Sequence, residues 1–115
     1  MKSLNFDVSN LSKNFNEVII LSVLGEANRH GYEIALEIEE RSNGAFKLNH
    51  GTLYPILHKL EKEGLIEGYW QSGQGKRKRK YYTITTNGNQ YLAAQTAAWK
   101  KFHGQLFTII GEKSE

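Results

Sequence analysis

After Gly64 the residue pattern changes from helical to strand-like, and after Thr85 it becomes helical again. Residues 65–71 and about 78–85 have the composition of two strands, and Ser72-Gly73-Gln74-Gly75 lies between them. Two strands around a glycine-bearing turn predict a β-hairpin. One hairpin in an otherwise helical sequence limits the chain to a mainly α fold with a small β element.

Three helical segments precede the hairpin. Residues 15–24 are apolar around most of a helix circumference, which predicts a first helix buried on several sides. A second helix is expected over about residues 30–43, followed by Gly44 as a natural stop. After a short extended piece at residues 45–48, a third helix is expected over about residues 50–63.

The start of the third helix has two alternatives. Pro55 has no N–H to donate, so it is best tolerated within the first helical turn, which would make Thr52 the N-cap. If Asn49 is the N-cap instead, Pro55 lies deeper and the helix carries a distortion. The sequence leaves both alternatives open.

A long final helix is predicted from a cap at Thr85-Thr86 to about Ile110. About 24 residues at ~1.5 Å each make a helix of roughly 36 Å, which is longer than a small three-helix body can cover. The same helix of a second copy, together with the apolar first helix, would cover the far half and give a two-fold dimer. The dimer candidates are Phe15, Ile19, Leu92, Thr96, Trp99, Phe102, Leu106 and Ile109.

Basic residues are concentrated at one place in the chain. The sequence has 15 basic and 12 acidic residues, and five of the basic ones are consecutive, Lys76 to Lys80. Without these five, 10 basic residues remain against 12 acidic ones. A local basic cluster on a mildly acidic body predicts a specific anionic partner.

Several functional classes find no support in the sequence. The chain has no cysteine, which excludes disulfides, thiolate metal sites and cysteine nucleophiles. Its four histidines form no metal-binding pair at i, i+3 or i, i+4, and no hydrolase or phosphate-loop motif is complete. The amino terminus is too polar for a secretory signal. We therefore expect a cytoplasmic, nucleoid-associated protein that is not an enzyme and has no cofactor or metal.

The predicted order of helices, short strand and hairpin is that of a winged helix-turn-helix. In this fold the third helix enters a major groove of DNA and the hairpin, called the wing, reaches the neighbouring backbone. The basic run falls on the wing, and the third helix has hydroxyl, imidazole and amine groups outside its core stripe, which suit phosphates and base edges. A solvated charge run, a localisation-like peptide or an ordinary wet helix face are the alternative interpretations.

Three segments and their spacing resemble the PadR-type transcriptional regulators over about residues 17–102. The segments are His30-Gly31-Tyr32-Glu33-Ile34, Gly51-Thr52-Leu53-Tyr54-Pro55 and Arg79-Lys80-Tyr81-Tyr82. The resemblance implies a dimeric bacterial or phage-type repressor, with a winged helix-turn-helix in residues 1–85 and a dimerisation helix in residues 86–115. It also implies that DNA contacts fall on Tyr32, Thr52, Tyr54 and the wing.

Together these arguments define the candidate DNA-binding residues. Gly31 and Gly51 each open a helix, where the missing side chain permits close approach to the backbone, for example by a phosphate at the positive end of the helix. The outer face of the third helix carries no Arg or Gln, so specificity is expected to rest partly on DNA shape and dimer spacing. The set is Tyr32, Asn49, Gly51, Thr52, Tyr54, His58, Lys59, Lys62, Lys76, Arg77, Lys78, Arg79 and Lys80.

Trp99 on the final helix has two interpretations. In the multidrug-binding branch of the PadR-type regulators, a tryptophan at the matching place lines a flat pore across the dimer axis. The resemblance therefore implies an effector site for planar aromatic or cationic compounds, formed by Glu17, Val18, Trp99 and His103. Alternatively, Trp99 packs the dimer core.

The sequence thus predicts a ligand-responsive repressor that binds double-stranded DNA as a homodimer at an inverted-repeat operator. The alternative is a small-molecule-binding or protein-interaction module with weak affinity for DNA.

Overall fold

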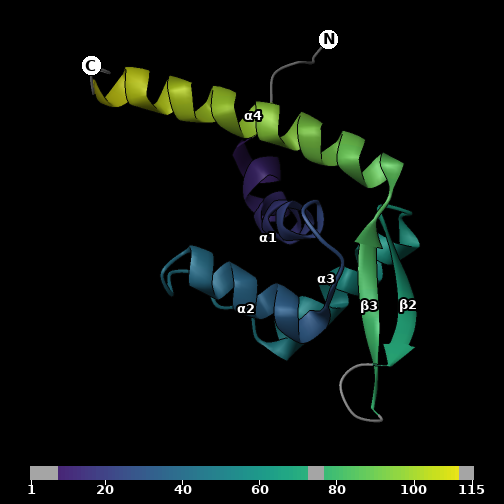
Figure 1. Cartoon of the computed structure of the whole chain (residues 1–115). Coiled ribbons are helices and arrows are strands. Elements are labelled where there is room, and N and C mark those ends of the chain that lie inside the picture. The colour runs from purple at the N-terminus through teal and green to yellow at the C-terminus, as the bar shows by residue number, and fades with distance from the viewer. Residues whose placement is uncertain (1–7, 73–76, 112–115) are drawn as a thin grey trace.

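In the computed structural model, a small sheet lies at one side of a body of helices (Figure 1). The structure describes residues 8–72 and 77–111 and the side chains of residues 14–72 and 77–111. This architecture confirms the predicted mainly α fold with a small β element. The elements are α1 (Val8–Leu24), β1 (Arg29–His30), α2 (Gly31–Arg41), α3 (His50–Lys62), β2 (Ile66–Ser72), β3 (Lys78–Ile84) and α4 (Thr86–Ile110).

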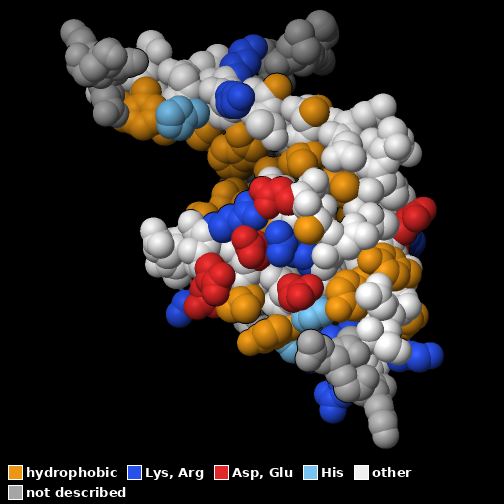
Figure 2. All heavy atoms as spheres, viewed as in Figure 1, with side chains coloured by type: hydrophobic (Ala, Val, Ile, Leu, Met, Phe, Trp, Pro, Cys, Tyr) orange, Lys and Arg blue, Asp and Glu red, His pale blue; other side chains and the backbone are white. Residues whose placement is uncertain are grey.

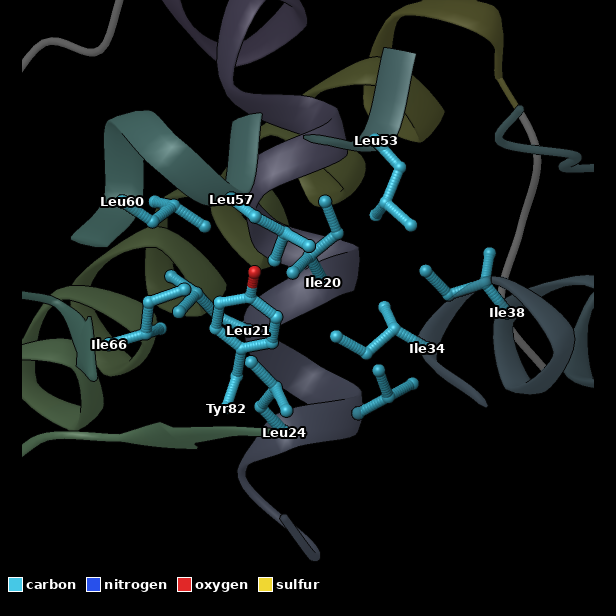
Figure 3. Close-up of a cluster of buried hydrophobic side chains, with 11 residues drawn as sticks. Ile20, Leu21, Leu24, Ile34, Ile38, Leu53, Leu57, Leu60, Ile66 and Tyr82 are labelled. Carbon is cyan, nitrogen blue, oxygen red and sulfur yellow. The ribbon is translucent and has the colours of Figure 1, made fainter. Parts of the chain in front are cut away.

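The core is built around α1. This helix packs against α2, α3, α4 and β3, which confirms that it is covered on several sides. Its apolar side chains meet the leucine stripe of α3, two isoleucines of α2 and one side chain from each wing strand (Figure 3). The buried residues are Ile20, Leu21, Val23, Leu24, Ile34, Ile38, Leu53, Leu57, Leu60, Ile66 and Tyr82.

Asn49 is the N-cap of α3. Its Oδ1 accepts a hydrogen bond from the Thr52 N–H at 3.0 Å, so the alternative with Thr52 as the cap is wrong. Pro55 therefore lies inside α3, and the Gly51 carbonyl lacks the N–H that it would normally accept from. The helix nevertheless continues to Lys62.

Three antiparallel strands form the sheet in the order β1-β3-β2. The expectation of a short strand between the second and third helices is wrong, because the third strand is β1, before α2, whose Arg29 and His30 pair with Tyr82 and Tyr81 of β3. β2 and β3 form the predicted hairpin, with Ile66 opposite Ile84 and Ser72 opposite Lys78. We call β2 and β3 the wing. Most of its predicted turn, residues 73–76, lies outside the described residues.

α4 begins against the body and extends beyond it (Figure 1). Thr85 caps it as predicted, accepting a hydrogen bond from the Gly88 N–H at 3.0 Å. Gly88 is buried where a methyl group would overlap the Leu65 carbonyl oxygen, which explains a glycine at this place. Leu106, Ile109 and Ile110 remain 38%, 81% and 59% exposed. Among the described residues, no helix is long and apolar enough to span a bilayer.

Candidate nucleic-acid interface

The wing faces the amino-terminal ends of α2 and α3 across a groove of about 660 Å³, which we call the wing groove. Basic side chains and histidines gather at this end of the molecule (Figure 2). The wing contributes Trp70, Arg77, Lys78, Arg79, Lys80 and Tyr82 to the lining. The helices contribute His30, Gly31, Tyr32, His50, Tyr54 and His58.

The wing cations differ in their partners. Lys80 is paired with Glu61 of α3 at 3.1 Å, and its ammonium lies 5.5 Å from the centre of the Tyr82 ring. Arg77, Lys78 and Arg79 are exposed and form no ion pair with any residue that the structure describes. These three side chains can therefore neutralise an external anion without breaking an ion pair to a described residue.

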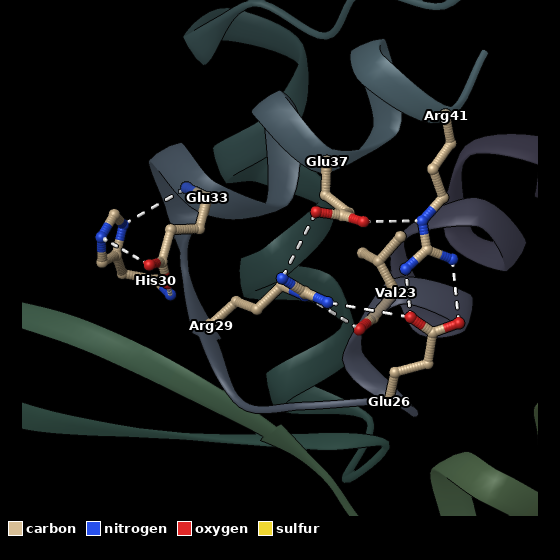
Figure 4. A network of polar contacts seen from close by, with 7 residues as sticks. All are labelled: Val23, Glu26, Arg29, His30, Glu33, Glu37 and Arg41. Carbon is tan, nitrogen blue, oxygen red and sulfur yellow. Dashed lines mark hydrogen bonds and ion pairs between the residues drawn. The ribbon is translucent and has the colours of Figure 1, made fainter.

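His30 is the N-cap of α2 and directs a donor toward the wing. Its Nδ1 accepts from the Glu33 N–H at 3.3 Å, and Glu33 Oε1 accepts from the His30 N–H at 3.1 Å (Figure 4). Accepting at Nδ1 leaves the proton of the neutral ring on Nε2, which lies 3.4 Å from Nη1 of Arg79. Burial lowers the pKa of His30, Glu33 opposes this shift and Arg79 adds to it. The neutral imidazole and the guanidinium are two neighbouring donors that suit one shared anion.

An ion-pair network ties α2 to the segment that joins it to α1 (Figure 4). Arg29 Nε donates to the Val23 carbonyl at 3.1 Å, and the Arg29 guanidinium lies 3.6 Å from Glu37 of α2. Arg41, near the other end of α2, binds both Glu37 and Glu26. His30, which follows Arg29 directly, is thereby held at the edge of the wing groove.

Tyr54 of α3 packs directly on Gly31 of α2. A methyl group at Gly31 would overlap the Tyr54 hydroxyl, so this contact requires glycine. The Tyr54 ring also meets His50 edge to face, with centroids 5.4 Å apart. Tyr32 is 58% exposed and stacks on His30 at 6.4 Å. The helix side of the wing groove is thus a packed surface of aromatic rings and histidines.

The profile of the family described as "Transcriptional regulator PadR-like family" matches residues 20–94. The chain belongs to this family. Members of the PadR-like family are DNA-binding transcriptional regulators and not enzymes, which agrees with the two expectations from the sequence. The fold described above is their winged helix-turn-helix.

Relatives and solved structures agree with the PadR-like assignment. A transcriptional regulator from Clostridium thermocellum is 29% identical, with a TM-score of 0.77 over 87% of this chain and 94% of that chain. A PadR-like regulator from Bacillus cereus is 26% identical, with a TM-score of 0.76 over 90% of this chain and 99% of the other. The negative transcriptional regulator PadR of Bacillus subtilis is 33% identical over 64% of this chain, but the match spans only 40% of that protein.

The wing groove brings together seven of the candidate DNA-binding residues, namely Tyr32, Tyr54, His58, Arg77, Lys78, Arg79 and Lys80. Four others, Asn49, Gly51, Thr52 and Lys62, are exposed at the start and outer side of α3. Lys76 lies outside the described residues. The sequence did not indicate His30, His50 and Trp70 as groove residues, since their residue types are not unusual in their segments. The His-x-x-Glu spacing of a capping box was the available signal for His30.

Lys59 is engaged within the protein. Its ammonium donates to Oε2 of Glu17 at 2.6 Å and lies 3.3 Å from Glu63. The bond to Glu17 raises the pKa of Lys59. Unlike Arg77, Lys78 and Arg79, Lys59 is therefore already neutralised by two carboxylates, and it does not line the wing groove.

Two of the four expected effector residues, Glu17 and His103, are engaged with other side chains. Both oxygens of Glu17 are used by other groups, Oε2 by Lys59 and Oε1 by the Tyr91 hydroxyl at 3.0 Å. The His103 ring packs on Phe107 with centroids 4.5 Å apart. Trp99 is half-buried, and Phe15 and Phe102 lie edge-on to it, each with centroids 5.8 Å away. Val18 is half-buried on α1.

Two polar atoms on the Trp99 face of α4 lack hydrogen-bond partners. Nε1 of Trp99 and Oε1 of Gln95 are buried and have none among the described residues.

None of the eight dimer candidates is fully buried in the single chain, and Thr96, Leu106 and Ile109 are exposed. Within residues 8–72 and 77–111, no group of three or more His, Asp or Glu side chains could hold a metal ion.

Proposed function

We propose that the protein is a repressor that binds an inverted-repeat operator in duplex DNA as a homodimer. The observation that carries this proposal is the wing groove, where Arg77, Lys78 and Arg79 lie opposite the amino-terminal end of α3 and form no ion pair with a described residue. In this arrangement α3 enters a major groove and the wing cations neutralise phosphates of the adjacent backbone. The protein acts on the DNA of the nucleoid, in the cytoplasm.

The exposed apolar end of α4 supports a two-fold dimer. Leu106, Ile109 and Ile110 extend along a helix that continues past the body of its own chain. Burying such side chains against a second α4 and α1 removes apolar surface from water and pairs two winged helices. Two α3 helices in successive major grooves lie about 34 Å apart, or roughly 10 base pairs.

Selection from a library of random duplexes, followed by footprinting, tests this proposal. The expected product is a sequence with two inverted half-sites about 10 base pairs apart, protected by two protein chains. Sedimentation of the complex gives the stoichiometry. Failure to enrich any duplex sequence would contradict the repressor and favour the module with weak DNA affinity.

We further infer an effector site at Trp99. The indole N–H lacks an acceptor among the described residues, and Phe15 and Phe102 flank the ring with their edges. A planar aromatic or cationic compound stacked on Trp99 would gain dispersion and cation–π attraction, and an acceptor atom on it would satisfy the indole. Because Glu17 and His103 have other partners, Trp99 and Val18 are the principal contacts in this proposal.

Fluorescence tests the effector site. In a Trp70→Phe background, a planar cationic acridine dye should quench Trp99, and Trp99→Ala should weaken dye binding by at least about tenfold in calorimetry. Trp70→Phe alone is the control, since Trp70 lies on the wing. Equal dye affinity before and after Trp99→Ala would assign Trp99 to the dimer core instead.

A further inference from the structure

One buried carboxylate joins the helix proposed to read DNA to the helix proposed to form the dimer. Glu17 of α1 is 6% exposed. Its Oε2 accepts from Lys59 of α3 at 2.6 Å, and its Oε1 accepts from the Tyr91 hydroxyl of α4 at 3.0 Å. These three residues, which we call the Glu17 bridge, lie outside the lining of the wing groove.

The Glu17 bridge fixes the orientation of the Glu17 carboxylate. Because the two oxygens bond to two different helices, the carboxylate cannot rotate without losing both partners. Glu63 lies 3.3 Å from the Lys59 ammonium and anchors it to the surface of α3. Burial, followed by the bond to Glu17, raises the pKa of Tyr91 to about 12, so its hydroxyl remains a donor at neutral pH. A buried carboxylate without partners is unfavourable, which disfavours arrangements in which α3 or α4 moves away.

The Glu17 bridge lies where it can fix the angle between α3 and α4. α1 packs against both α3 and α4, and Glu17 lies where it meets both. In a dimer held through α4, the angle between α3 and α4 determines how far apart the two α3 helices lie. A small rotation of α3 would therefore change the half-site spacing that both protomers can bind at once.

We propose that Glu17 is a positioning residue for operator binding, which through Lys59 and Tyr91 sets the half-site spacing that the dimer accepts. The proposal rests on the proposed dimeric repressor. Glu17 touches no DNA in it, and Lys59, which the sequence suggested as a DNA contact, acts through its ion pair with Glu17.

Operators with altered spacing test the proposal. The parent protein should bind the selected operator at least about tenfold more tightly than operators one base pair shorter or longer. Glu17→Gln keeps the shape but removes the charge, and Tyr91→Phe removes only the hydroxyl. Both should reduce this preference to about threefold or less. Glu63→Gln is the matched control, because it removes an exposed carboxylate from the same lysine and leaves the Glu17 bridge in place.

A second measurement needs no DNA. The chain has no cysteine, so Lys62→Cys gives one spin-labelling site on the exposed side of α3 in each protomer. The distance distribution between the two labels should be narrow with Glu17 present and about twice as wide after Glu17→Gln or Tyr91→Phe. Thermal unfolding of each variant measures its stability separately.

The outcomes separate the two proposals. Unchanged spacing preference and unchanged label distances in both variants, even with lowered thermal stability, would make Glu17 a packing residue and overturn the positioning role. Absence of any label-to-label signal in the parent would show that no dimer forms, which overturns the proposed function itself. A changed preference with an intact fold supports the positioning role.

Discussion

Replacing Lys78 and Arg79 together by glutamine will weaken operator binding by at least about 100-fold, because four phosphate contacts per dimer are lost. Both side chains are exposed in the wing groove and have no internal ion pair among the described residues. Each lost contact lowers the slope of log affinity against log salt by about 0.9, so the slope should fall by about 3 to 4. Fluorescence anisotropy at several salt concentrations measures both quantities.

The matched control for this prediction removes the same charge elsewhere. Lys100→Gln with Lys101→Gln takes two exposed cations from α4, far along the sequence from the wing. This variant should keep most of the affinity and nearly the full salt slope. Equal losses in both double variants would mean that net charge, and not the wing groove, drives binding. No loss in the wing variant would place the DNA on another surface.

The order of helices and the hairpin could be predicted because each element carries its own periodicity. β1 could not, since Arg29 and His30 are too few to alternate, and their pairing with β3 depends on the tertiary fold. The N-cap of α3 is a similar case. The preference of proline for the first turn suggested Thr52, but the Asn49 side chain accepts from the Thr52 N–H, so the helix begins at His50 and Pro55 lies beyond its first turn.

The candidate site was predictable where its residues are adjacent in sequence. The wing cations form one run, so their local charge was visible. His30 and His50 come from two separate segments, and only the fold brings them to one groove. Lys59 was predicted as a DNA contact, because an outward lysine on the third helix suits a phosphate. Its actual partner, Glu17, lies 42 residues earlier in the sequence, and only the fold brings the two together.

Gly31→Ala will lower the free energy of unfolding by about 1–3 kcal/mol, the usual cost of adding an atom to a filled site. Its methyl group would overlap the Tyr54 hydroxyl and ring, so the ring must shift away from α2. Operator affinity should fall with it, because Tyr54 lines the wing groove. Urea unfolding and anisotropy measure the two effects. Adding Tyr54→Phe removes the closest overlapping atom and should restore part of the lost stability.

Gly51→Ala provides the matched comparison, since both glycines open a helix and neither has a positive φ. A methyl group at Gly51 would meet only Asn49 Oδ1, at 3.4 Å, so helix propensity should raise stability by up to about 1 kcal/mol. If a phosphate approaches this exposed backbone, the same methyl group weakens operator binding while the fold becomes more stable. Loss of stability at Gly51, or none at Gly31, would contradict the packing that assigns one glycine to the contact between α2 and α3 and the other to the DNA surface.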